Sequence, residues 1–110
     1  MHLDIRTIRN TVVVRTEGEL DMLVAERLRQ EVDEILSQKG VKNLILNLEK
    51  VTFIDSSGLG VIIGRYKKVS STGGRMYIVG VQPQVEKILQ FSGINRLISI
   101  YSNEQDIINL

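Results

Sequence analysis

The stretch F-I-D-S-S-G-L-G, residues 53–60, marks the junction between a strand and a helix. It follows a short apolar run at residues 44–48, and it opens a pattern in which apolar residues recur at helical spacing. A short, nearly continuous apolar run is typical of a strand that is buried on both faces of a parallel sheet. The junction therefore predicts a strand–helix unit of an α/β fold.

Segments on both sides of this junction also alternate between strand and helix patterns. Two segments near the N-terminus, separated by Arg9 and Asn10, predict a hairpin that ends at Gly18. Strands that alternate with helices imply a mainly parallel sheet with right-handed crossovers, and the hairpin makes that sheet mixed. We expect one α/β domain over residues 1–110 with about four helices. The expected strands are 3–8, 11–16, 44–48, 76–79 and 97–100, and the expected helices are 21 to about 38, 55 to 72, 83–92 and from about 102 onward.

The helical patterns also predict which side chains are buried. In the first helix the apolar stripe begins at Met22, and Asp33 falls among the residues left for solvent. In the second helix the stripe includes Leu59 and Ile62. Arg65 falls in the C-terminal part of this helix, where a cation interacts favourably with the helix dipole.

Three of the expected helices begin next to residues that can cap them. Asp21 and Asp55 precede the first two helices, and an aspartate at the N-cap accepts hydrogen bonds from free backbone N–H groups. Ser102 and Gln105 have the spacing of a capping box for the last helix. If Asp55 is the cap, Ser56 is the first helical residue and its hydroxyl is free to face solvent.

Gly58 and Gly60 stand in the opening turns of the second helix, where glycine is unfavourable. One interpretation is that the missing side chains let the backbone of another protein, such as a kinase, approach Ser56 closely. The alternative is that Asp55, Ser56 and Ser57 only cap the helix, while the glycines permit tight packing of the helix on the sheet.

Composition excludes several classes of function. The chain has 14 Lys and Arg against 13 Asp and Glu, so its formal charge of +1 offers no basic surplus for nucleic acid. It has no cysteine, which excludes disulfides and cysteine-bound zinc. We find no signal-peptide core and no apolar run that could span a bilayer, so we expect a cytoplasmic domain with no membrane partner.

Enzymatic readings of the serine motif are weak. A nucleophilic serine needs a base, and the only histidine is His2, near the N-terminus. The motif lacks the glycine two residues before the serine that a G-x-S-x-G elbow requires. Gly58, Gly60 and Gly64 are one residue off the dinucleotide-binding pattern, and no Lys-Ser follows to make a phosphate loop. We therefore expect no enzyme activity, no cofactor and no metal site.

The chain resembles the STAS domains of bacterial anti-sigma factor antagonists. The resemblance covers nearly the whole sequence, and D-S-S-G-L-G after a buried strand is its most specific element. Within the family, G-R-Y-K at residues 64–67 favours the sporulation branch, which acts on the sigma-F anti-sigma factor, over the general-stress branch. The matching segments are residues 18–21, 46–49, 53–68 and 91–93.

The resemblance implies a regulatory cycle. The unphosphorylated protein binds an anti-sigma factor that is also a serine kinase, and this frees the sigma factor. Phosphorylation of Ser56 by that kinase separates the pair, and a serine phosphatase restores the active form. Carried over by position, the residues that line the partner surface are Asp21, Asp55, Ser57, Gly58, Leu59 and Gly60.

One departure from the family pattern affects the partner surface. Sporulation members often carry polar residues after the position of Asp21, whereas this chain has Met22 and Leu23. Either the first helix begins differently, or this part of the interface is more apolar here. Two alternatives with the same fold stay open, namely a general-stress antagonist and a scaffold STAS subunit of a stress-sensing assembly.

Overall fold

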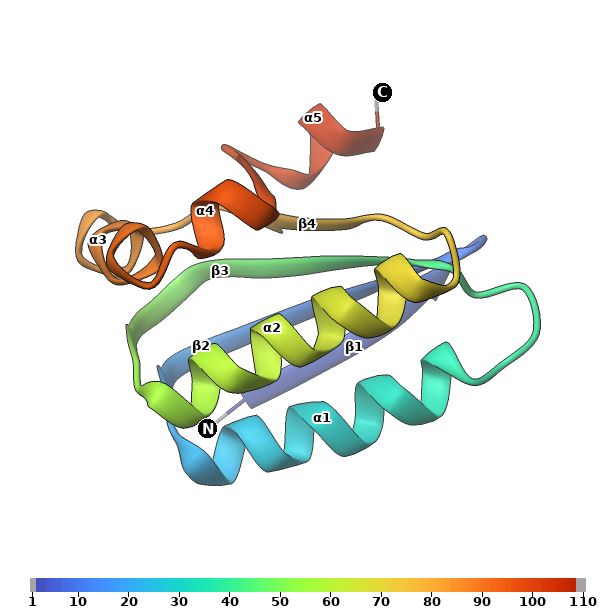
Figure 1. Cartoon of the computed structure of the whole chain (residues 1–110), viewed down its shortest axis with the longest axis horizontal. Helices are drawn as coiled ribbons and strands as arrows, with labels where there is room; N and C mark the ends of the chain where they lie inside the picture. The colour runs from blue at the N-terminus through green and yellow to red at the C-terminus, as the bar shows by residue number, and fades with distance from the viewer. Residues whose placement is uncertain (1, 109–110) are drawn as a thin grey trace.

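Five strands form one mixed sheet in residues 2–108, the part of the chain that the computed structural model describes (Figure 1). The order across the sheet follows the chain, β1 (His2–Ile8), β2 (Thr11–Leu20), β3 (Asn43–Ile54), β4 (Met76–Val79) and β5 (Ser99–Tyr101). β1 pairs antiparallel with β2, and every later pairing is parallel. The mixed, mainly parallel sheet predicted from the sequence is confirmed. The helices are α1 (Met22–Leu36), α2 (Ser56–Ser71), α3 (Pro83–Ser92), α4 (Ile94–Leu97) and α5 (Glu104–Ile108).

The two faces of the sheet are covered unequally. α1 and α2 run side by side over one face, where they bury the larger core (Figure 1). Alternate strand residues such as Leu44, Leu46 and Ile78 point into that core, and α3 and α4 add Leu89 and Ile94. The other face buries only a small cluster of Val13, Ile45 and Val79, against which α5 packs Ile107.

Two strands are longer than the sequence patterns predicted. The hairpin was expected to end at Gly18, but β2 continues through Gly18 at a φ of 84° to Leu20, with register shifts on both sides of Gly18. β3 continues beyond Leu48 to Ile54, because its second half keeps β2 as a pairing partner. These extensions carry both strands to the same edge of the sheet, where Leu20 pairs with Ile54.

Most helix boundaries agree with the sequence prediction. Asp21 and Asp55 are the N-caps of α1 and α2, as expected. The short helix α4, between Gly93 and the last strand, was not predicted, so the described residues hold five helices where about four were expected. The prediction that Ser102 caps the last helix was also wrong. Asn103 is the capping residue of α5, because its Oδ1 accepts a hydrogen bond from the Asp106 amide.

Two burial predictions were wrong, one for Met22 and one for Asp33. Met22 was expected in the core but is 67% exposed, and the buried side of α1 starts at Val24. Asp33 was expected to face solvent but is half-buried, and Arg65 was expected only to lie near the negative end of the α2 dipole. The guanidinium of Arg65 is instead buried between the helices, with Nε 3.0 Å from Asp33 Oδ1. Burial lowers the pKa of Arg65, and the carboxylate of Asp33 acts against that shift.

Candidate functional site

Two helices begin next to each other at one edge of the sheet. Leu20 and Ile54, the last residues of β2 and β3, are paired, and each is followed by an aspartate that caps a helix. The amide of Asp55 donates a hydrogen bond of 3.3 Å to the carbonyl oxygen of Leu20. Because this bond links the two connections directly, the starts of α1 and α2 lie side by side (Figure 1).

Both capping carboxylates are engaged with their own helices. Asp21 Oδ1 accepts from the Val24 amide at 3.1 Å, and Asp55 Oδ1 accepts from the Gly58 amide at 2.9 Å. Each bond satisfies one of the free N–H groups of a first helical turn. The caps therefore fix where α1 and α2 begin.

Ser56 is the first residue of α2 and is exposed, whereas Ser57 is half-buried. Within residues 2–108 neither hydroxyl has a hydrogen-bond partner, so exposure is what distinguishes them. Asp55, the neighbour of Ser56 in the sequence, carries a carboxylate that could act as a base. Its Oδ1 already accepts a hydrogen bond from the Gly58 amide. The hydroxyl of Ser56 is thus accessible to an external enzyme.

The two glycines of the motif have different roles. Gly58 is buried, and a Cβ built there would lie 2.5 Å from the carbonyl oxygen of Leu20 and 2.8 Å from Cγ2 of Ile54. The expectation that Gly58 leaves room for a partner is wrong, since its missing side chain serves packing inside the domain. Gly60 is exposed with nothing within 4 Å of such a Cβ, so the packing alternative does not hold there.

Four exposed or half-buried apolar side chains lie on the helices at this end of the domain, and we call them the apolar rim: Met22, Leu23, Leu59 and Phe91. Met22 and Leu23 are 67% and 74% exposed in the first turn of α1. Leu59 of α2 and Phe91 of α3 line one shallow, mostly apolar hollow, and Phe91 is 97% exposed. Exposed apolar side chains that gather in one place indicate a protein-binding surface.

The sequence patterns placed only part of this rim. Leu59 was named from the motif, and Met22 and Leu23 were noted as a departure from the family pattern. Phe91 was noted only as part of a matching segment. Its position off the α3 face that buries Val85 and Leu89 is the signal that would have found it.

The described residues show neither a metal centre nor a membrane span. Within residues 2–108 no three His, Asp or Glu side chains are grouped so that they could hold a metal ion. In the same part of the chain, no helix is sufficiently long and apolar to cross a bilayer.

Residues 2–107 match the STAS domain family, and the chain belongs to that family. The chain is 36% identical to an anti-sigma F factor antagonist of Paenibacillus polymyxa over 104 residues, which cover 94% of this chain and 89% of the relative. A second relative, an anti-sigma F factor antagonist of Lysinibacillus sphaericus, is 35% identical over 108 residues, which cover 97% of this chain and 92% of the relative.

Two solved structures share this fold over almost the whole chain. One is the anti-sigma factor antagonist SpoIIAA in its unphosphorylated form, with a TM-score of 0.88 and 32% identity, covering 98% of this chain and 94% of that one. The other is the Bacillus cell fate determinant SpoIIAA in the phosphorylated form, with a TM-score of 0.80 and 31% identity, covering 98% and 97%. The similar proteins therefore include one whose fold has been solved both with and without the phosphoryl group.

Proposed function

We propose that this protein is a cytoplasmic anti-sigma factor antagonist whose binding to an anti-sigma factor is switched off by phosphorylation of Ser56. The observation that carries the proposal is the position of Ser56, exposed at the first residue of a capped helix whose start is joined to that of α1 by the Asp55–Leu20 hydrogen bond. The names of the similar proteins supply the partner class, and the solved phosphorylated relative supports a phosphoryl switch.

The partner would bind across the starts of α1 and α2. The apolar rim offers area that loses contact with water on binding, which favours association. Asp21, Asp55, Ser57 and Gly60 border Ser56 and would meet polar groups of the partner. Gly58 would not contact the partner directly. It would support the binding surface, because its lack of a side chain lets the start of α2 pack against Leu20. The partner we propose is an anti-sigma factor that is also a serine kinase, with a serine phosphatase to reverse the reaction.

Phosphorylation of Ser56 would act locally. A phosphoryl group adds about −1.5 to −2 charge at neutral pH. The helix dipole favours that charge by about 0.3–1 kcal/mol. Asp55 opposes it, because two unit charges about 4 Å apart repel by roughly 4 kcal/mol at an effective dielectric near 20, and less when solvent screens them. With these terms opposed, the fold is retained while the partner would have to bury a dianion beside the apolar rim.

The resulting loss of affinity is large enough for a switch. A loss of about 3 kcal/mol in the complex corresponds to binding weaker by more than a hundredfold. No rearrangement elsewhere in the domain is required for that change. We propose that the protein acts in the sporulation pathway, because residues 64–67 match that branch of the family. Binding to a general-stress anti-sigma factor instead would assign it to the general-stress pathway.

The decisive experiment maps the phosphate. Wild type, Ser56→Ala and the matched control Ser57→Ala are incubated with the anti-sigma factor kinase of the source organism and ATP, and phosphate is located by mass spectrometry. We expect phosphate on Ser56 in the wild type and in Ser57→Ala, and none in Ser56→Ala. Phosphate on Ser57 in the wild type, or retained by Ser56→Ala, would refute the site.

Binding is measured in the same samples. Ser56→Ala should stay bound to the kinase when ATP is added, whereas the wild type should be released. Pull-down with sigma-F and sigma-B anti-sigma factors, each with and without ATP, distinguishes the two pathways. A large assembly that is insensitive to ATP would instead indicate a scaffold subunit.

We further propose that the protein is not itself an enzyme. Ser56 has no histidine near it in sequence, and the Oδ1 of Asp55 is engaged with Gly58. Purified protein should show no turnover on a panel of esters and phosphoesters. Turnover that disappears in Ser56→Ala would contradict this proposal.

A further inference from the structure

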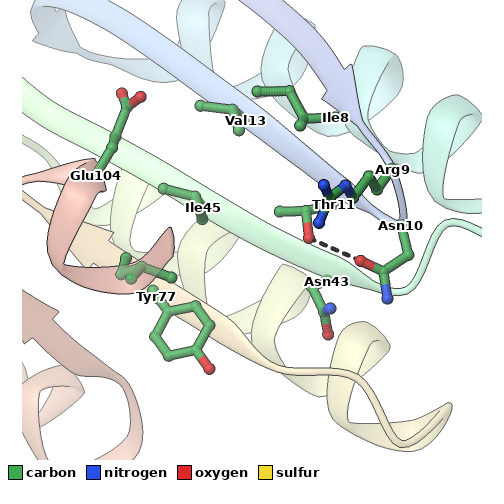
Figure 2. Close-up of a pocket in the computed structure, with 10 residues that line it drawn as sticks. Ile8, Arg9, Asn10, Thr11, Val13, Asn43, Ile45, Tyr77 and Glu104 are labelled. Atoms are coloured by element: carbon green, nitrogen blue, oxygen red, sulfur yellow. Dashed lines mark hydrogen bonds between the residues drawn. The ribbon is translucent and has the colours of Figure 1, made fainter. Parts of the chain in front are cut away.

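The face of the sheet opposite α1 and α2 carries a hollow that the proposed function does not use. It has a volume of about 450 Å³ and lies between the β1–β2 turn and α5 (Figure 2). Ser56 follows the C-terminal end of β3, whereas Asn43 at the N-terminal end of β3 borders the hollow. We call it the hairpin hollow, and its lining residues are Ile8, Arg9, Asn10, Thr11, Val13, Asn43, Ile45, Tyr77, Glu104 and Ile107.

The floor of the hairpin hollow is apolar. Val13 and Ile45 of the central strands form its base, and Tyr77 and Ile107 stand beside them half-buried. Ile8 at the mouth is 51% exposed. Because the five-residue helix α5 packs on this cluster without covering all of it, apolar surface stays open to a ligand. The volume lies in the range of small-molecule sites, about 300–1,000 Å³.

The mouth presents amide N–H groups. Asn10 Oδ1 accepts from Thr11 Oγ1 at 3.1 Å, and Asn43 Oδ1 accepts from the Arg75 amide at 2.9 Å. These bonds use the oxygen of each amide. Within residues 2–108 the nitrogens of both side chains have no acceptor, so they are available as donors to an anionic or carbonyl oxygen.

The charge at the mouth is positive. Glu104 is the acidic residue in the lining. Its Oε1 accepts a hydrogen bond of 2.7 Å from Arg15, and its Oε2 accepts one of 2.7 Å from Asn47. Hydrogen bonds from Arg15 hold the pKa of Glu104 below its usual range, so it is ionised and neutralised by Arg15. Arg9, in contrast, has no ion-pair partner in the described part of the chain, so its charge is uncompensated.

Arg9 also has an unusual backbone conformation. Its φ is 57°, in the left-handed region. Among residues 2–108, Arg9 is the only residue other than glycine that has a positive φ. Two-residue hairpin turns usually place Gly or Asn where φ is positive, because a larger side chain is strained there. In Figure 2 the guanidinium of Arg9 is drawn on the side of the turn that faces Thr11. Strain of this kind at a ligand-accessible residue points to a function for its side chain.

We propose that the hairpin hollow binds a small amphipathic carboxylate, with its alkyl part on Val13 and Ile45 and its carboxylate on Arg9 and the amides of Asn10 and Asn43. The guanidinium suits a carboxylate, since its paired N–H donors match the two oxygens. A hollow of about 450 Å³ is large enough for a medium-chain acid. This site is independent of Ser56 and of the proposed function.

The proposal is tested by titrating isotope-labelled full-length protein with octanoate and, separately, with octanol, while amide NMR shifts are followed. Octanoate should give saturable shifts at Val13, Ile45 and Tyr77 and leave Ser56 unmoved. Octanol should bind at least tenfold more weakly. Absence of saturable shifts, shifts centred elsewhere, or equal binding of octanol would overturn the proposal.

Variants separate the charge from the apolar floor. Arg9→Gly removes the guanidinium and relieves the left-handed strain, so it should melt no lower than wild type yet bind octanoate about tenfold more weakly. Ile8→Ser should weaken octanoate and octanol alike. The control Arg75→Gln removes an exposed arginine whose backbone, not its side chain, bonds Asn43, and it should bind octanoate as the wild type does. Wild-type octanoate binding by a folded Arg9→Gly would refute the carboxylate assignment.

Discussion

Gly58 at the start of α2 lies directly against the backbone carbonyl of Leu20 at the end of β2. This contact joins the two capped helix starts, and it allows Ser56 to stand on a rigid element rather than on a loose loop. The relationship also explains why the glycine is tolerated in the first turn of a helix.

Gly58→Ala should destabilise the domain by about 1–3 kcal/mol, because the added methyl meets a backbone atom that cannot move aside easily. The matched control is Gly60→Ala, which meets nothing within 4 Å and should stabilise by roughly 0.5–1 kcal/mol. Urea unfolding of both variants measures the difference. Equal stabilities would show that α2 can shift away from Leu20.

Ile62→Ala should cost about 2–5 kcal/mol, because Ile62 is fully buried in the main core. Leu59→Ala should cost less, since Leu59 is only half-buried beside the hollow that it shares with Phe91. Both values come from denaturant unfolding. A neutral Ile62→Ala would place this face of α2 away from the sheet.

Asp33→Ala should destabilise by about 3–5 kcal/mol, because it leaves the buried guanidinium of Arg65 without its partner. Arg65→Ala should cost less through charge, since Asp33 keeps Lys68 at 3.6 Å and Arg29 at 4.0 Å. The two variants are compared by thermal and urea unfolding. Arg65→Met keeps most of the packing of the side chain and removes only its charge, so it measures the electrostatic part of the loss. A greater loss of stability in Arg65→Met than in Asp33→Ala would contradict this prediction.

Stability should fall in acid through Glu104. Its pKa is lowered in the folded protein by hydrogen bonds from Arg15 and Asn47. Because the pKa of Glu104 is lower in the folded protein than in the unfolded chain, where it is near 4.5, the ionised carboxylate stabilises the fold at pH values above 4.5. This stability is lost as the pH falls through the pKa of the folded protein. Unfolding free energies from pH 7 to pH 3 should therefore decline less steeply in Glu104→Gln. Parallel profiles would show that other carboxylates dominate.

Ser56→Asp should melt within a few degrees of the wild type. The dipole at the start of α2 favours the new charge by about 0.3–1 kcal/mol, while repulsion from Asp55 opposes it. Differential scanning calorimetry measures this, and Ser57→Asp serves as the control that places the charge at a half-buried position. A large loss of stability in Ser56→Asp would mean that phosphorylation acts by unfolding the site rather than by excluding the partner.

Local signals in the sequence determined the α/β class, the mixed sheet and the starts of two helices. Asp21 and Asp55 could be recognised as caps because capping depends on residues within one turn of the chain. The exposure of Ser56 follows from the same local geometry. The motif that carries the proposed function was therefore readable before any tertiary contact was known.

Tertiary structure alone decided how those pieces meet. The different roles of Gly58 and Gly60 depend on whether β2 ends beneath the helix, and spacing along α2 cannot reveal that. The second half of β3 is a strand because β2 pairs with it, although its own residues include exposed Thr52 and Phe53.

The same holds for contacts between distant elements. The helical pattern assigned Asp33 to solvent and did not indicate that Arg65 is buried, and only the packing of α1 on α2 brings the two side chains together. The hairpin hollow exists because α5, far along the chain, covers part of a sheet face that β2, β3 and β4 build. Pairings between segments far apart in the chain leave no periodic trace in either segment. Local patterns therefore indicated most of the helices and strands, whereas long-range packing set the full length of β2 and β3 and the surfaces that the elements form.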